Sequence, residues 1–150
     1  MEFEKAYAVS DGERMIRQRV FVDEQGYENE FDEIDGAPGT CHILALLEGV
    51  PAGCCRVFPE GPGQWRIGRV AVLPEFRRRG IASALLKEAE DYLRAQGAKS
   101  VRVGAQCTAE PLYRRSGYVV CGSIFYDEKT PHVPMIKNLD GSSPAQPPRQ

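Results

Sequence analysis

A short basic turn between an apolar run and an amphipathic segment holds the residues best placed for chemistry. Arg77 to Arg79 precede Gly80, and apolar residues then recur at helical spacing from Ile81 to about Gly97. The first N–H groups of a helix have no intrahelical partner and lie at the positive end of its dipole, so this turn is a candidate anion site. Gly80 and Ala82 are small enough to leave room for a phosphate. The alternative interpretation is a solvated basic turn with a chance glycine.

The elements that position this turn are predicted from periodicity and turn signals. The segment before it, residues 64–73, is rich in β-branched residues, and Pro74 ends it because proline has no N–H group to donate. Apolar runs at 41–47 and 52–58 precede this segment and are joined to it by tight turns, which indicates an antiparallel meander. After the helix, residues 100–105 are predicted to pair in parallel with 64–73, because parallel pairing requires a crossover of this kind.

The remaining segments complete one domain. We expect a strand at 3–9, a helix capped by Ser10 or Asp11 that ends near Gln25-Gly26, a short helix at 108–116 stopped by Gly117, and two last strands at 118–126 and 132–138. Residues 1–139 form this domain. The polar segment 140–150 has nothing to bury and is expected to be disordered.

Composition argues against several classes of function. The net charge of −2 gives no global basic field that would favour nucleic acid. The five cysteines are an odd number without a C-x-x-C pair, so they predict reduced thiols and no metal site. No apolar run approaches the ~20 residues that cross a bilayer, and the polar start has no signal-peptide pattern. We therefore expect a cytoplasmic protein that binds neither membrane nor nucleic acid.

The basic turn also carries a family resemblance. The pattern Arg77-x-x-Gly80-x-Ala82 between a strand and a helix resembles the signature of the GNAT acetyltransferases, which holds the pyrophosphate of acetyl-CoA. Ala82 is within that pattern, although many relatives have glycine there. The resemblance implies that acetyl-CoA is the co-substrate and that no metal takes part. The cofactor-binding residues are then Val70, Ala71, Val72, Arg77, Arg78, Arg79, Gly80, Ile81, Ala82 and Ser83.

The resemblance extends from about residue 3 to residue 139. The order of predicted elements is similar to the GNAT fold, which implies an α/β (α+β) domain. Its sheet is mixed, mostly antiparallel and twisted, with a central parallel strand pair and helices on both faces. Segments 16–26, 105–106, 112–118 and 131–135 look like the bacterial ElaA/YjcF-like branch. The oligomeric state stays open, and a homodimer is compatible with the resemblance.

Acetyl transfer to an amine requires a proton donor for the departing thiolate and a group that removes the amine proton. The pKa of a tyrosine is ~10, so Tyr113 on the short helix is protonated at neutral pH, and the resemblance implies that it is the general acid. A core aromatic is the alternative for Tyr113. The base stays open among Glu24, Glu33, Asp35, His42 and His132. Cys107 lacks a visible base partner, so direct transfer is favoured over a covalent intermediate.

The acidic segment 23–35 is the candidate acceptor rim. Together with His132, its residues Glu24, Glu33 and Asp35 are expected to bind the acceptor, which favours a small cationic primary amine. A solvated acidic loop is the alternative. A protein lysine or N-terminus is a further candidate acceptor, and a non-catalytic CoA-binding regulatory module is a competing function.

Loss of ladder pairing at Leu73-Pro74 is expected to free backbone N–H groups for the pantetheine arm and the oxyanion.

Overall fold

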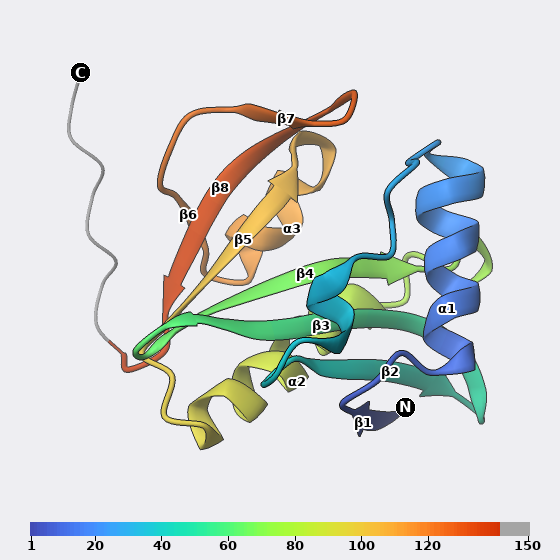
Figure 1. Ribbon diagram of the computed structural model, residues 1–150, viewed down its shortest axis with the longest axis horizontal. Helices are drawn as coiled ribbons and strands as arrows, with labels where there is room; N and C mark the ends of the chain where they lie inside the picture. Colours follow the sequence, from blue (N-terminus) through green and yellow to red (C-terminus); the bar gives the residue numbers. More distant parts are fainter. Residues whose placement is uncertain (142–150) are drawn as a thin grey trace.

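A computed structural model describes residues 1–141 and places them around a single mixed sheet (Figure 1). The strand order is β1-β2-β3-β4-β5-β8-β6, with β7 paired to β8. Every pairing is antiparallel except that of β4 with β5. The strands are β1 (Glu2–Ala6), β2 (Cys41–Leu47), β3 (Val50–Gly61), β4 (Gln64–Val72), β5 (Ser100–Gln106), β6 (Val119–Val120), β7 (Phe125–Asp127) and β8 (Thr130–Asn138). The predicted meander and the central parallel pair are confirmed.

Helices cover both faces of this sheet, as predicted. The helix α1 (Asp11–Arg17) begins at Ser10, whose side-chain oxygen accepts a hydrogen bond from the Glu13 N–H at 3.1 Å. It continues as a π-helical segment, η1 (Gln18–Glu24). The other helices are α2 (Ile81–Ala95) and α3 (Glu110–Arg115), with short 3₁₀ turns η2 (Glu33–Gly36), η3 (Pro74–Phe76) and η4 (Cys107–Ala109).

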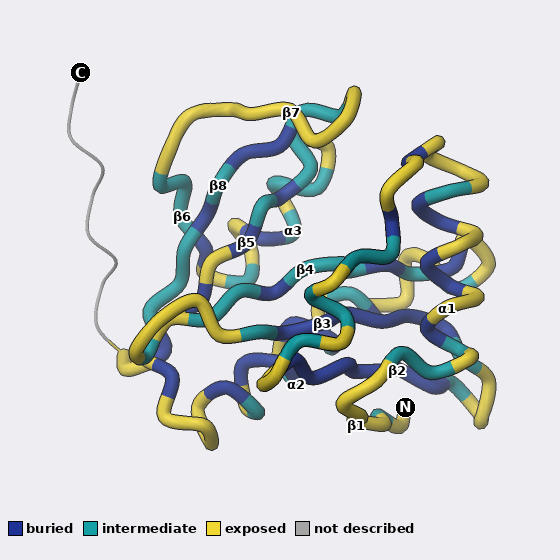
Figure 2. The backbone as a smooth tube through the Cα atoms, in the orientation of Figure 1, coloured by how far each residue is buried: buried dark blue, intermediate teal, exposed yellow. Residues whose placement is uncertain are grey.

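Two separate apolar clusters are buried on the two faces of the sheet. Figure 2 shows buried residues along β2, β3 and α1. The larger apolar cluster lies under α2 and includes Leu85, Leu93 and Val103. The smaller one lies under α1 and includes Ile16 and Cys54. Neighbouring residues of a strand point to opposite faces, so this division assigns each β3, β4, β5 and β8 side chain to the α1 face or the α2 face.

The last hairpin differs from its prediction. Residues 118–126 form two short strands, β6 and β7, that pair with different parts of β8, and residues 121–124 leave the sheet between them. Pro134 on β8 lies opposite this gap and has no N–H group, so it accepts from the Cys121 N–H at 2.9 Å but donates nothing back. A side chain at Gly122 would lie 2.8 Å from the Pro134 ring. The ladder therefore breaks where proline removes its donor.

Two further expectations concern the ends of the chain and the cysteines. The strand β1 ends at Ala6, earlier than the predicted Val9. All five cysteines are free thiols. Most of the predicted tail, from residue 142 onward, lies outside the described residues. Among residues 1–141, no helix is long and apolar enough to cross a membrane.

Candidate active site

The central parallel pair opens into a wedge. The strands β4 and β5 are paired only from Gln64 to Ile67, opposite residues 100–103, whereas β4 stays paired with β3 up to Val72. A bulge in the β3–β4 ladder coincides with Arg69, which has a φ of 52°. Bulges bend a strand and increase its twist, so this one turns β4 away from β5. The loss of pairing was predicted at Leu73-Pro74; it begins earlier, at the β5 edge of β4.

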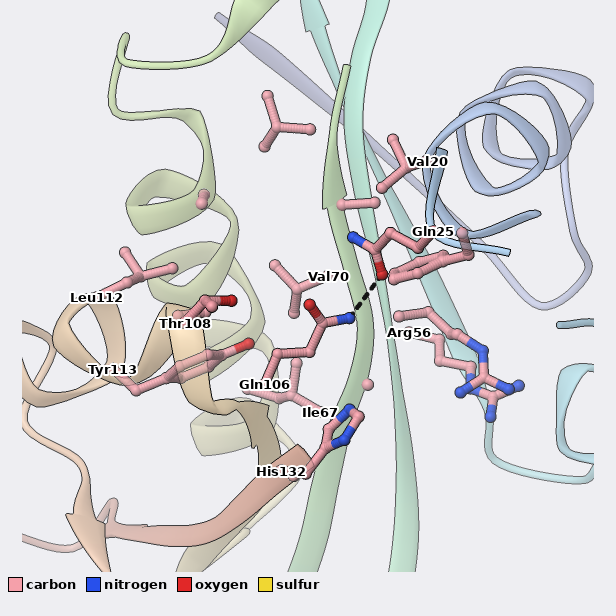
Figure 3. Close-up of a pocket in the computed structure, with 18 of the residues that line it drawn as sticks. Val20, Gln25, Arg56, Ile67, Val70, Gln106, Thr108, Leu112, Tyr113 and His132 are labelled. Carbon is pink, nitrogen blue, oxygen red and sulfur yellow. Dashed lines mark hydrogen bonds between the residues drawn. The ribbon is translucent and has the colours of Figure 1, made fainter. Parts of the chain in front are cut away.

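A cavity of about 860 Å³ occupies this wedge (Figure 3). Nine of the ten predicted cofactor residues line it: Val70, Ala71, Val72, Arg77, Arg78, Gly80, Ile81, Ala82 and Ser83. Arg79 is not among the lining residues, and its guanidinium lies 5.7 Å from the centre of the Phe76 ring. The cavity volume is within the ~300–1,000 Å³ range of small-molecule and cofactor sites. The sequence therefore located one wall of a real cavity.

The turn before α2 fits the anionic end of a CoA molecule. Gly80 has a φ of 77°, and no atom lies within 4 Å of the position that a Cβ would take there. Its carbonyl accepts the first helical hydrogen bond from the Ala84 N–H at 3.0 Å, so the N–H groups before Ala84 have no helical partner. Arg77 is already engaged, because it donates to Glu24 at 2.7 and 2.9 Å and to the Val72 carbonyl at 3.0 Å.

Tyr113 reaches the cavity from α3. Its side chain is buried, its ring packs edge-on against Tyr118 with centroids 5.7 Å apart, and its hydroxyl points toward the cavity in Figure 3. Burial raises the pKa of the Tyr113 hydroxyl above the usual value for a tyrosine. The phenol therefore stays protonated, and able to donate, over a wider pH range than the reference value implies.

The cavity passes through the sheet. Tyr113 belongs to the apolar cluster under α2, together with Val103 and Ala105 of β5. Gln106 and His132 sit at alternate positions of β5 and β8, so they face α1 instead. Figure 3 shows Tyr113, Gln106 and His132 around one space beside β4. Groups on the two faces thus meet at the wedge.

His132 is held so that one ring nitrogen is free to accept a proton. Its Nδ1 lies 2.9 Å from the Thr130 carbonyl oxygen. Because a carbonyl only accepts hydrogen bonds, Nδ1 carries the hydrogen, and the neutral ring has its lone pair on Nε2. The ring stacks on Phe125 with centroids 5.4 Å apart and lines the cavity. His132 is the member of the predicted base set with this geometry.

The other predicted acceptor residues do not line the cavity. Asp35 is bound by Arg17 at 2.7 Å and by Arg56 at 2.9 Å. Glu24 pairs with Arg77, and Glu33 lies in the short turn η2. These carboxylates are neighbours in one acidic segment of the sequence. The arginines that pair with most of them come from elements that are distant in sequence.

His42 is structural as well. Its Nδ1 lies 2.9 Å from a Glu13 carboxylate oxygen, and its Nε2 lies 2.9 Å from the Asp35 carbonyl oxygen. Burial alone would lower the pKa of His42, but these hydrogen bonds outweigh it and raise the pKa overall. The ring is therefore engaged on both sides and is removed from the list of candidate bases.

The sequence reasoning missed the residues that close the α1 side. The Gln106 amide donates to the Gln25 side-chain oxygen at 2.7 Å, which bridges β5 and the end of η1 (Figure 3). Arg56 and Arg66, from β3 and β4, line the same side. The signal that was available is the strand alternation, which puts Arg66, Gly68, Gly104 and Gln106 on the face opposite Val101 and Val103.

Comparison with known proteins agrees with this geometry. Residues 9–139 match the acetyltransferase (GNAT) domain. A Bacillus subtilis protein named as an acetyltransferase is 34% identical over 85% of this chain and 88% of its own length. The uncharacterised N-acetyltransferase YjcF of B. subtilis is 30% identical over 82% of this chain and 88% of its own.

Solved structures give the same fold. Escherichia coli ElaA superposes with a TM-score of 0.81 at 21% identity, over 91% of this chain and 98% of that one. The similarity of this chain to ElaA and to YjcF agrees with the ElaA/YjcF-like branch predicted from the sequence. The chain belongs to the GNAT family of acyl-CoA-dependent acetyltransferases.

Proposed function

We propose that the protein moves an acetyl group directly from acetyl-CoA to the primary amine of a small molecule. The observation that carries this proposal is the wedge between β4 and β5, with Tyr113 on its α2 side and His132 on its α1 side. A proton donor and a proton acceptor on opposite sides of one opening suit a reaction in which the two substrates enter from opposite faces of the sheet.

The α2 side suits acetyl-CoA. The N–H groups at the start of α2 and the open Gly80 position would hold the pyrophosphate, with Arg78 beside it. The residues Val70 to Val72 would line the pantetheine arm, because they line the cavity and β4 has lost its β5 partner there. Acetyl-CoA supplies the activated acetyl group, and the chain supplies orientation and proton transfer.

Proton transfer is assigned to two side chains. A bond forms between the amine nitrogen and the acetyl carbon, and the bond between that carbon and sulfur breaks. The amine attacks in its neutral form, and its nitrogen then loses one proton to Nε2 of His132, while the Tyr113 hydroxyl donates its proton to the departing thiolate. The Tyr113 phenolate then regains a proton from solvent or from His132.

A small acceptor suits the α1 side better than a protein chain. The Gln25–Gln106 hydrogen bond crosses the cavity, and Glu128 accepts from the Glu28 N–H at 2.9 Å, which joins the β7–β8 turn to the segment after α1. These bridges narrow the entrance. The cationic acceptor predicted from the acidic segment loses part of its basis, because Asp35 and its neighbours are already paired with arginines.

The cofactor site is tested by a matched pair of glycine variants. Gly80→Glu places bulk and negative charge at the turn, whereas Gly97→Glu makes the same change at the other end of α2, with a φ of 80° and equal space. A ligand at 100 times its Kd adds ~2.7 kcal/mol to stability, so acetyl-CoA should raise the melting temperature of wild type and Gly97→Glu. Gly80→Glu should lose most of this increase.

Activity is tested by thiol release from acetyl-CoA with a panel of small primary amines. Thiol release that depends on the added amine supports the proposed transfer of an acetyl group to an amine. A full melting shift with acetyl-CoA but no amine-dependent thiol release would favour the regulatory CoA-binding module instead. An unchanged melting shift in Gly80→Glu would remove the turn from the cofactor site.

A further inference from the structure

We propose that the acceptor carries an anionic group, of the carboxylate class, in addition to its amine, and that Arg66 binds this group on the α1 side of the cavity. The inference rests on the proposed function, because it concerns the acceptor of that reaction. It is carried by the position and hydrogen bonding of Arg66, by the glycines beside it and by a second guanidinium.

Arg66 presents unused donors to the cavity. Its Nε donates to Glu60 at 2.8 Å, and its two terminal nitrogens make no hydrogen bond to any residue within 1–141. The side chain lines the cavity and is 34% exposed, so these donors are accessible. An arginine held at Nε with its terminal nitrogens free is oriented for a planar anion, since a guanidinium binds a carboxylate through two parallel N–H groups.

Two glycines make the surface beside Arg66. Gly68 and Gly104 lie where β4 and β5 part, and both line the cavity. A Cβ at Gly104 would lie 3.1 Å from the Phe125 ring and 3.9 Å from an Arg66 terminal nitrogen. Phe125 therefore packs directly against Gly104, and a side chain at this position would displace the ring. The two glycines add no side-chain bulk beside Arg66.

Arg56 adds a buried N–H donor, without a partner among the described residues, at the same place. It pairs with Gly68 across the β3–β4 ladder, and its Nε lies 3.9 Å from the position of a Gly68 Cβ. Its terminal nitrogens bind Asp32 and Asp35, but the buried Nε has no partner among the described residues. An unsatisfied buried donor is unusual in a folded protein and commonly marks a functional site or an absent ligand.

Among residues 1–141, the carboxylate that pairs with Arg66 is Glu60, and it contacts Nε alone. Glu30, Asp127 and Glu128 also line the cavity, but none of them pairs with Arg66. Glu30 lines the cavity, but it is bound by Arg17 at 2.7 Å and by Arg69 at 2.9 Å. Glu128 accepts backbone N–H groups at the entrance. Of the three arginines that line the α1 side, Arg56 and Arg69 are each bound by two carboxylates, whereas Arg66 is bound by one through Nε alone.

The test compares acceptors that differ only in the anionic group. β-Alanine, β-alaninamide and propylamine form one set, and 4-aminobutyrate, its amide and butylamine form another. With wild type, thiol release should show kcat/KM roughly tenfold or more higher for each carboxylate, the range of one charge-assisted pair. Arg66→Gln should remove this preference by raising KM for the carboxylates, and Arg66→Lys should retain part of it.

Arg102→Gln is the matched control. Arg102 lies directly opposite Arg66 in the parallel ladder, carries the same charge, is exposed and does not line the cavity. It should leave the preference unchanged. Equal turnover of carboxylates, amides and plain amines by wild type would overturn the inference, and so would an unchanged preference in Arg66→Gln.

A binding measurement separates this inference from the proposed function. With CoA present, N-acetyl-β-alanine should raise the melting temperature of wild type and Arg102→Gln but not of Arg66→Gln, and N-acetylpropylamine should raise none. Absence of thiol release with every amine would contradict the proposed acetyl transfer to amines. The melting shifts would still show whether Arg66 binds the anionic group. Equal shifts in wild type and Arg66→Gln would exclude Arg66 as the anion-binding residue.

Discussion

The face of the sheet under α2 is buried mainly by apolar side chains, whereas the face under α1 combines a smaller apolar cluster with a network of buried charges. Leu85 and Leu93 on α2 are fully buried in the larger cluster. On the other face, Arg17 is also fully buried, and its five N–H donors are all used in hydrogen bonds to Glu13, Glu30 and Asp35. The two faces contribute differently to the site.

The apolar face contributes mainly stability, and the charged face also shapes the α1 side of the cavity. Apolar contacts are not directional, so the α2 face tolerates small adjustments. Ion pairs are directional, and the carboxylates that bind Arg17 also bind Arg56 and Arg69, which line the cavity. Burying these charges is costly unless each is paired. The comparison suggests that the network is retained for the geometry of the site rather than for stability alone.

The largest expected effect comes from breaking the charged face. Arg17→Leu leaves three carboxylates without their central partner and should lower the free energy of unfolding at pH 7 by ~3–5 kcal/mol. The loss should shrink as the pH falls, because protonated carboxyl groups no longer need the arginine. Urea unfolding at pH 7 and pH 4 measures this difference.

Leu85→Ala is the matched variant on the apolar face. Leu85 is as deeply buried as Arg17, and its truncation should cost ~2–5 kcal/mol from lost packing and the remaining cavity. That cost should be the same at both pH values. A similar pH dependence for the two variants would mean that the faces do not differ in the way described.

The next largest effect concerns Tyr113, which belongs to the apolar face and also lines the cavity. Tyr113→Phe keeps the ring and its packing against Tyr118 and deletes only the hydroxyl. We expect kcat to fall by ~10²-fold or more, the range of a general acid, with acetyl-CoA affinity within a few-fold of wild type. Because burial raises the pKa of Tyr113, the alkaline limb of the wild-type pH–rate profile should lie above the reference pKa of ~10. Tyr113→Phe should lack this limb.

Tyr118→Phe is the control for Tyr113→Phe. Tyr118 contacts Tyr113, donates to Glu90 at 2.8 Å and does not line the cavity. Its variant should lose stability and keep kcat. Unchanged kcat in folded Tyr113→Phe, with chemistry shown to be rate-limiting, would make Tyr113 a packing residue only.

Acid should weaken the charged face at a defined pH. Burial alone would raise the pKa of Asp35, but its hydrogen bonds with Arg17 and Arg56 outweigh burial and lower it from 3.8 to about 2. This carboxylate therefore contributes stability above pH ~4, on the order of 2 kcal/mol, which is lost as the pH falls toward 2. In unfolding measurements from pH 6 to pH 2, Asp35→Asn should show a weaker pH dependence than wild type. Parallel curves would contradict the assignment to Asp35.

The smallest effect links the charged segment to the cofactor turn. Glu24 holds Arg77 in an exposed ion pair beside the entrance. Glu24→Gln should release Arg77 toward the phosphates and lower the Kd for acetyl-CoA by a few-fold at most, because exposed pairs contribute little. If Glu24 instead binds the acceptor, as the sequence suggested, the acceptor KM should rise. Glu75→Gln, which alters the nearby exposed pair with Arg19, is the control.

Much of the fold and one side of the site were predictable. The periodicity of α2, the proline after β4 and the turn around Gly80 are local features, so the sequence carries them directly. They located one wall of the cavity, apart from Arg79, which lies beside Phe76. The break between β6 and β7 was missed because its cause, Pro134, lies on the neighbouring strand.

The α1 side of the cavity was decided by tertiary structure. The carboxylates of residues 30–35 are adjacent in sequence, but Arg17, Arg56 and Arg69 reach them from three different elements. Likewise, the wedge that exposes Arg66 depends on a bulge in the β3–β4 ladder. The sequence by itself determined most of the strands and helices and the turn before α2, since these depend on near neighbours. Only the packed sheet decided which charges are neutralised and which face the cavity, because pairing partners are chosen by proximity in space.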